Sequence, residues 1–234
     1  LSHIENRLEH YFTSTTQYSR LILNSTVIQN SLDMYYRDKK HFLAPKIDMS
    51  LEINKLIYPA PYIYGISIYN TDYDIIVSSE RKQYPTDFKN IDVSYGIWLT
   101  SKKYALYEDV IIDTFSYICP IYDYRSGDLY GYTELVLSKQ SIADIYSVSG
   151  PAGSYFLLLD DNYNVVSKSD YLDNKSELTQ NIINAMKKEN VGHAFTGFGF
   201  INTMLLKPYS WRLVHIIPLY LFIKPAFAIA FAFI

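Results

Sequence analysis

Cysteine is nearly absent from this chain of 234 residues, in which Cys119 is the only one. A single thiol excludes an internal disulfide, so the fold must depend on apolar cores, which a chain of this length has room to build. Such a protein fits the cytosol, and it fits equally an extracytoplasmic domain large enough to fold without disulfides. We expect Cys119 to be a small buried side chain rather than a redox site.

An excess of basic charge is also missing. The 21 basic and 24 acidic residues leave a net charge of −3, so no basic field is available to hold nucleic acid. The chain begins without an initiator Met and without the charged and then apolar pattern of a signal peptide. Together with an apolar run at the other end, this indicates a piece of a longer membrane protein.

The sequence also lacks the motifs of common enzyme and metal sites. The five His show no paired ligand spacing, and the Asp-rich turns at 70–74 and 160–164 lack the Gly and the terminal Glu of a calcium loop. The stretch Gly192–Gly199 lacks the spacing of a nucleotide loop, and no Ser lies in a nucleophile elbow. We therefore expect no catalysis, no cofactor and no metal in this segment.

One long apolar run is present, at the C-terminus. Apolar and polar side chains roughly alternate from Trp211 to Ile217, which predicts a strand that ends at Pro218. The next 16 residues, 219–234, carry Lys224 as their only charge. A helix of that length covers roughly 24 Å of a hydrocarbon core about 30 Å thick. We expect the start of a transmembrane helix, and the alternative is a buried C-terminal helix of a soluble domain.

Glycine and proline are missing from the first 40 residues, where apolar or small side chains recur in steps of three and four. This spacing predicts one face of a helix. If continuous, the helix would be on the order of 50 Å long. We expect a stalk over residues 1–45 that ends at Pro45, followed by a short helix at Ile47–Ile57.

A hairpin pattern occurs twice along the chain. Residues 66–80 and 156–170 agree in character at nearly every position, with Tyr73 matching Tyr163 and Ser79 matching Ser169. Such a repeat predicts two copies of one supersecondary unit. A chance match is the alternative, because turn chemistry restricts which residues a hairpin can use.

Further elements complete each copy. Strands at 115–122 and 129–137 form a second hairpin, and a short helix follows near 140–146. After the break at Gly150–Gly153, the second copy continues with a helix at about 176–189 and closing strands. We expect two domains, at 46–149 and 150–218.

The order of these features resembles the double Cache sensor domain. The resemblance rests on the long N-terminal helix, two PAS-like units, the strand motifs Pro120-Ile-Tyr-Asp123 and Leu129-Tyr-Gly-Tyr132, and the final strand Trp211–Pro218, which precedes the expected membrane helix. It covers nearly the whole chain. It implies an α+β fold, in which a long N-terminal helix is followed by two PAS-like antiparallel-sheet domains. Such domains are similar to the extracytoplasmic parts of sensor histidine kinases of low-GC Gram-positive bacteria and of chemoreceptors.

In that family the membrane-distal domain holds a small ligand between its sheet and the covering loops. Amino-acid-binding members bind the carboxylate of the ligand through an Arg-x-Trp-Tyr motif and the ammonium of the ligand through a downstream Tyr and Asp. Trp98 matches the Trp, but Gly96 stands where the Arg would be and Leu99 replaces the Tyr. Glu108 or Asp109 lies at about the separation of the ammonium-binding Asp. These departures put α-amino-acid recognition in doubt.

Eight residues of the first domain are candidate ligand-binding residues. A polar ligand needs a few convergent donors and acceptors on an apolar wall. Aromatic rings supply stacking area, an Arg can form two parallel hydrogen bonds to a carboxylate or sulfonate, and acidic side chains accept hydrogen bonds from an amine. Each of these residue types is also common in cores and on solvated surfaces. The candidates are Arg81, Trp98, Tyr104, Tyr107, Glu108, Asp109, Tyr117 and Tyr122.

The resemblance implies an extracytoplasmic sensor at the cell membrane, anchored by flanking helices and homodimeric, that binds a small molecule such as an amine or a carboxylate. We expect a two-component sensor histidine kinase whose catalytic part lies outside this segment. The alternatives are the ectodomain of a methyl-accepting chemotaxis receptor and a surface structural module without a ligand.

Overall fold

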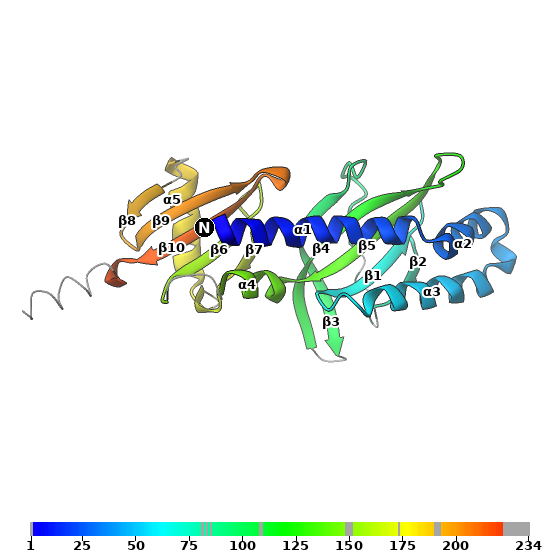
Figure 1. The fold of residues 1–234 in the computed structure, drawn as a ribbon, viewed down its shortest axis with the longest axis horizontal. Helices are drawn as coiled ribbons and strands as arrows, with labels where there is room; N and C mark the ends of the chain where they lie inside the picture. Colours follow the sequence, from blue (N-terminus) through cyan, green and yellow to red (C-terminus); the bar gives the residue numbers. More distant parts are fainter. Residues whose placement is uncertain are drawn as a thin grey trace, which may run out of the picture. The chain divides into compact units, whose positions relative to one another are not determined.

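The computed structural model describes residues 2–80, 82, 84, 86–107, 110–147, 152–172, 174–189 and 193–221. The chain forms two compact units, each built on a five-stranded sheet (Figure 1). The first unit comprises Tyr11–Lys139, and the second unit comprises Leu1–His10 and Gln140–Ile234. The boundary expected at Gly150 lies outside the described residues.

The N-terminal region contains a break where one continuous helix was expected. Helix α1 (Ser2–Leu23) and helix α2 (Thr26–Arg37) are separated at Asn24 and Ser25. Ser25 caps α2, because its Oγ accepts a hydrogen bond from the Ile28 N–H at 3.5 Å. The apolar spacing continues across the break because both helices bury one face.

Pro45 lies inside the first turn of helix α3 (Leu43–Ile57), after the short 3-10 turn η1 (Lys39–His41). The first N–H groups of a helix have no intrahelical acceptor, so a proline there costs no hydrogen bond. The expected stop at Pro45 is therefore wrong, and the helix expected from Ile47 begins at Leu43.

The first sheet is antiparallel throughout, in the order β2-β1-β5-β4-β3. One face packs against α1, where the rings of Phe12 and Trp98 lie 5.0 Å apart. The other face packs against the segment between β2 and β3, where the ring of Phe88 lies 5.2 Å from that of Tyr69. The strands are β1 (Ile63–Tyr69), β2 (Ile75–Ser78), β3 (Ile97–Tyr107), β4 (Val110–Tyr122) and β5 (Leu129–Ser138).

The second sheet has the equivalent order, β7-β6-β10-β9-β8. Helix α5 (Ser176–Glu189) contributes Ile182 and Met186 to a core shared with Leu157 and Val214. The strands are β6 (Tyr155–Leu159), β7 (Val165–Lys168), β8 (His193–Thr196), β9 (Gly199–Leu206) and β10 (Trp211–Pro218). The remaining elements are α4 (Lys139–Ser147), η2 (Asp170–Leu172) and η3 (Lys207–Tyr209).

The hairpin repeat is present in detail. Tyr73 and Tyr163 both adopt the left-handed conformation, with φ of 67° and 63°. The hydroxyls of Ser79 and Ser169 each accept a hydrogen bond of 2.8 Å from a backbone N–H of the first strand. Both turns close on an Asx side chain: Asn70 Oδ1 accepts from the N–H groups of Asp72 and Asp74, and Asp160 Oδ1 accepts from those of Asn162 and Asn164.

The expected strand Trp211–Pro218 is confirmed as β10. The expected membrane helix at 219–234 lies mostly outside the described residues, which end at Leu221. Within the described ranges, no helix combines the length and the apolar character that a bilayer crossing requires.

Candidate functional site

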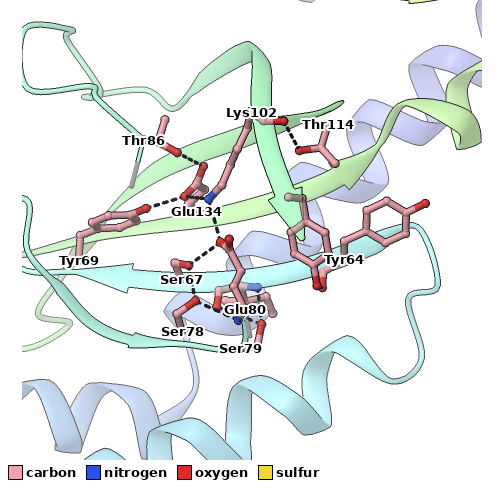
Figure 2. A network of polar contacts seen from close by, with 12 residues as sticks. Tyr64, Ser67, Tyr69, Ser78, Ser79, Glu80, Thr86, Lys102, Thr114 and Glu134 are labelled. Atoms are coloured by element: carbon pink, nitrogen blue, oxygen red, sulfur yellow. Dashed lines mark hydrogen bonds and ion pairs between the residues drawn. The ribbon is translucent and has the colours of Figure 1, made fainter. Parts of the chain in front are cut away.

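Three charged side chains meet on the face of the first sheet that packs against the β2–β3 segment. Lys102 Nζ lies 2.8 Å from Glu80 Oε1 and 2.7 Å from Glu134 Oε2 (Figure 2). The exposed fractions of the three side chains are 3% for Lys102, 2% for Glu80 and 0% for Glu134. We call these three residues the charge cluster.

Three separate elements bring the cluster together. Glu134 lies on the central strand β5, where it pairs with Ile118 of β4 and Ser67 of β1. Lys102 lies on β3, just after a register shift between Leu99 and Lys102. Glu80 follows the end of β2. Since alternate strand residues face opposite sides of a sheet, the bulge in β3 decides which side Lys102 faces.

Glu134 is fully hydrogen-bonded. Its Oε1 accepts from the Thr86 hydroxyl at 2.7 Å, and its Oε2 accepts from the Tyr69 hydroxyl at 2.7 Å as well as from Lys102 (Figure 2). A buried carboxylate with this many donors is strongly anchored. Glu134 therefore acts as the fixed member of the charge cluster.

Glu80 is only partly hydrogen-bonded. Its Oε1 accepts from Lys102 and from the Ser67 hydroxyl, the latter at 3.1 Å. Its Oε2 is buried and has no hydrogen-bond partner among the described residues. A buried polar atom without a partner is costly, and in a native protein it needs an explanation.

The electrostatics of the charge cluster are unbalanced. Two carboxylates face one ammonium, and each buried ion costs several kcal/mol of desolvation. Burial raises the pKa of the Glu80 carboxyl, although Lys102 beside it opposes this shift. Burial and the neighbouring Glu134 carboxylate also raise the pKa of the Tyr69 hydroxyl. Tyr69 therefore stays a hydrogen-bond donor at physiological pH.

A cleft of about 500 Å³ adjoins the charge cluster, which is within the size range of small-molecule sites. Lys102 and Thr86 line the cleft and also bond to the cluster carboxylates. The hydroxyl oxygen of Tyr84, on the cleft wall, is buried and has no partner among the described residues. The lining residues are Tyr84, Thr86, Asp87, Leu99, Thr100, Ser101, Lys102 and Lys103.

Two of the predicted aromatic residues face the opposite side of the sheet. The rings of Trp98 and Tyr117 lie 4.7 Å apart, and Trp98 also contacts Phe12 of α1 and Phe115 of β4. These side chains form the core between the sheet and α1. The structure does not bring them to the cleft.

The other predicted residues are distributed along β3 and β4. Tyr104 stacks on Tyr64 with 5.5 Å between ring centroids and donates its hydroxyl to the Tyr64 carbonyl at 2.6 Å. It lies close to Glu80, since a Cβ added at Gly65 would meet both side chains. Tyr107 and Tyr122 are exposed, at 61% and 47%, and lie near opposite ends of β4. Arg81, Glu108 and Asp109 lie outside the described residues.

The sequence analysis missed the charge cluster. A signal for it is visible in β5, where Glu134 lies between the aromatic residues Tyr130 and Tyr132 and the apolar run Leu135–Leu137. An acidic residue in the middle of a buried strand requires a buried partner. The partner itself could not be read from the sequence, because Lys102 reaches this face only through the bulge in β3.

The comparisons with known proteins identify the fold. No protein-family model and no curated protein matches the chain. The sensor domain of the Vibrio cholerae histidine kinase DctB is similar, with a TM-score of 0.62 at 10% identity over 93% of this chain and 95% of that one. The ligand-binding domain of the Campylobacter jejuni chemoreceptor Tlp3, solved with L-norvaline, also gives 0.62, at 11% identity over 91% of this chain and 86% of that one.

These likenesses cover both units. The expected α+β architecture, an N-terminal helix followed by two antiparallel sheets, is confirmed, although that helix is shorter than expected, and the chain has the double Cache fold. At identities near one in ten the likeness describes the fold alone. The function must therefore be argued from the site.

Proposed function

We propose that this chain is the extracytoplasmic ligand-sensing domain of a membrane-bound two-component sensor histidine kinase. The first unit would be the membrane-distal domain and would bind a small polar molecule in its cleft. The observation that carries this proposal is the buried charge cluster beside the cleft, with an unpartnered carboxylate oxygen on Glu80. A purely structural cluster gains nothing from leaving that oxygen unpaired.

The proposed mechanism is a population shift. A ligand that binds one arrangement of the first unit more tightly than another shifts the balance between the two. The proposal further assigns residues 219–234 to a membrane helix, so that β10 leads from the second sheet into the bilayer. A homodimer fits this role, because kinases of this kind phosphorylate in trans.

Part of the predicted site remains in the proposal. Tyr104 beside Glu80 is suited to contact a ligand, and Arg81, Glu108 and Asp109 retain the chemistry that suggested them. Trp98 and Tyr117 would act indirectly, by holding the sheet against α1. The domain division proposed at 46–149 and 150–218 assigns the charge cluster and the cleft to one domain.

The ectodomain of a chemotaxis receptor is the second candidate. The likeness to the Tlp3 domain favours it as strongly as the likeness to the DctB domain favours a kinase. The two candidates share the ligand site and differ in the cytoplasmic part of the protein. The gene sequence beyond Ile234 distinguishes them directly.

A thermal-shift screen of the dialysed chain tests the ligand-binding role. The screen covers amino acids, amines, carboxylates and sugars. A ligand at a hundred times its Kd stabilises the fold by about 2.7 kcal/mol, which raises the Tm by several degrees. We expect one chemical class to stabilise the chain. If no class does, the proposal fails and a surface structural module becomes the better explanation.

A further inference from the structure

The β8–β9 hairpin forms one edge of the second sheet. Its residues, 193–206, include no Asp, Glu, Lys or Arg. Edge strands of soluble proteins usually carry charged side chains that discourage contact with other molecules. The equivalent edge strand of the first sheet, β3, has such a charge in Lys103, whose side chain is 60% exposed. The uncharged edge at β8 therefore indicates contact with a partner.

Apolar side chains cross this edge in a row. Phe195 of β8 pairs with Phe200 of β9, and Phe200 pairs with Ile217 of β10. Because directly paired residues of neighbouring antiparallel strands point to the same face, the three side chains are neighbours. The rings of Phe195 and Phe200 lie 5.0 Å apart, and Phe195 is 72% exposed. We call these three residues the apolar row.

The apolar row lies at the end of the sheet where β10 finishes. Pro218, the last residue of β10, pairs with Gly199 in the hairpin (Figure 1). The row is thus one residue from the end of β10, a distance of about 3 Å along the strand. Phe195 lies two strands away from β10, or about 10 Å to the side.

The residues that follow β10 are attached to the same end of the sheet. The Leu219 N–H donates a hydrogen bond of 3.3 Å to the Phe198 carbonyl of the hairpin. The Tyr220 hydroxyl donates one of 3.3 Å to the Gly153 carbonyl, just before β6. The apolar run 219–234 therefore begins on the sheet itself, and no slack segment separates it from the hairpin.

We propose that the apolar row lies in the headgroup layer of the membrane, with Phe195 in contact with lipid. This inference rests on the proposed assignment of residues 219–234 to a membrane helix, and it adds a second lipid contact beside that helix. The headgroup layer is roughly 5–8 Å thick on each side of the hydrocarbon core, which accommodates a ring about 3 Å from the end of β10. Aromatic side chains are enriched at this depth. Two points of contact would prevent the second sheet from rotating freely about the helix.

Two tryptophan variants of the full 234-residue chain test this placement. Phe195→Trp places a fluorescent ring in the apolar row. Leu205→Trp is the control, because Leu205 is 47% exposed but lies six residues beyond Gly199 on β9, about 20 Å away. The chains are inserted one per disc into nanodiscs of phosphatidylcholine and phosphatidylglycerol, with or without brominated acyl chains. The wild-type chain gives the background of the natural Trp98 and Trp211.

We expect brominated lipid to quench the added fluorescence of Phe195→Trp and to leave that of Leu205→Trp unchanged. Aqueous iodide should show the reverse order, with a quenching constant about threefold or more lower for Phe195→Trp. Both positions are exposed in the folded chain, so neither substitution disturbs a core.

Three outcomes would overturn the inference, and they differ in what else they affect. Inserted chains in which brominated lipid quenches neither position, or both equally, would refute the lipid contact and leave the membrane anchor standing. A blue shift of Phe195→Trp emission without lipid quenching, seen only in discs that hold two chains, would assign the edge to a second copy. A chain that does not insert into discs at all would refute the proposed anchor at 219–234, and the inference would fail with it.

Discussion

Lys102 is the residue on which the buried charge of the first unit depends. It is the only cation within bonding distance of Glu80 and Glu134 among the described residues. Removing one partner of a buried ionic cluster leaves the others uncompensated, which typically costs more than the cluster contributes as a whole. The cost falls on the folded state, because the unfolded chain exposes the same carboxylates to water.

Lys102→Met should therefore lower the free energy of unfolding by about 3–5 kcal/mol at pH 7. Two facing carboxylates without a cation have raised pKa values in the folded state, so the stability lost at neutral pH returns as the pH falls and one of them protonates. Urea unfolding at pH 7 and pH 5 measures both effects.

The neighbouring lysine provides the control for this prediction. Lys103 pairs with Asp113 on the surface, where the two side chains are 60% and 54% exposed. Lys103→Met should cost less than about 1 kcal/mol at either pH. Equal losses in the two variants, or a loss in Lys102→Met that grows toward pH 5, would contradict the role given to the charge cluster.

At the scale of single residues, the sequence predicts which residue types suit a ligand site better than it predicts which face of the sheet each one occupies. Trp98 and Tyr117 have suitable chemistry for a ligand site, but β4 is buried on both faces around Tyr117, so no apolar–polar alternation in that strand shows which face holds the ligand. The bulge between Leu99 and Lys102 then changes the register within β3. Local sequence does not encode that shift in a recognisable pattern.

At the scale of single elements, the hairpins were predictable because turn chemistry is local. Asn70 and Asp160 close their turns on backbone N–H groups only two and four residues away. The break between α1 and α2 was harder to predict, since the apolar spacing continues through it and Ser25 is its main signal. A capping serine is common enough in sequences that it does not by itself predict a helix end.

Two glycines near the β4–β5 turn are required for different reasons, one because a neighbouring strand lies close to it and the other because of its own backbone conformation. Gly131 has φ of 145°, and an added Cβ would lie 2.0 Å from the Tyr69 carbonyl oxygen on the neighbouring strand β1. Gly127 has φ of 77°, and an added Cβ would meet nothing within 4 Å. Gly131→Ala must therefore displace β1 from β5, whereas Gly127→Ala only strains its own backbone.

We expect Gly127→Ala to cost about 1–2 kcal/mol of unfolding free energy and Gly131→Ala to cost more than about 3 kcal/mol. Thermal unfolding followed by circular dichroism compares the two variants. Similar costs in the two variants would show that β1 and β5 can separate without a loss of unfolding free energy, which would contradict the close approach of the two backbones.

At the scale of the whole molecule, each unit has its own sheet and its own core. The strand order was not predictable from local patterns, since β5 pairs with β1 across a long stretch of sequence. The resemblance to double Cache domains predicted two antiparallel sheets but not their strand order, and the hairpin repeat supported the two-sheet architecture. Separate cores have an energetic consequence, because a cavity in one core should weaken mainly the unit that contains it.

A reciprocal pair of core variants tests this consequence. Ile182 of α5 is fully buried in the core of the second unit, and Phe88 is 1% exposed in the core of the first. Ile182→Ala should lower the opening free energy of amides in β6 and β10 by about 2–5 kcal/mol, and Phe88→Ala should lower that of β1 and β5 by about 3–5 kcal/mol. Native-state hydrogen exchange resolves the two sets of amides. If either variant lowers both sets equally, the chain unfolds as one cooperative body and the division into two units has no energetic meaning.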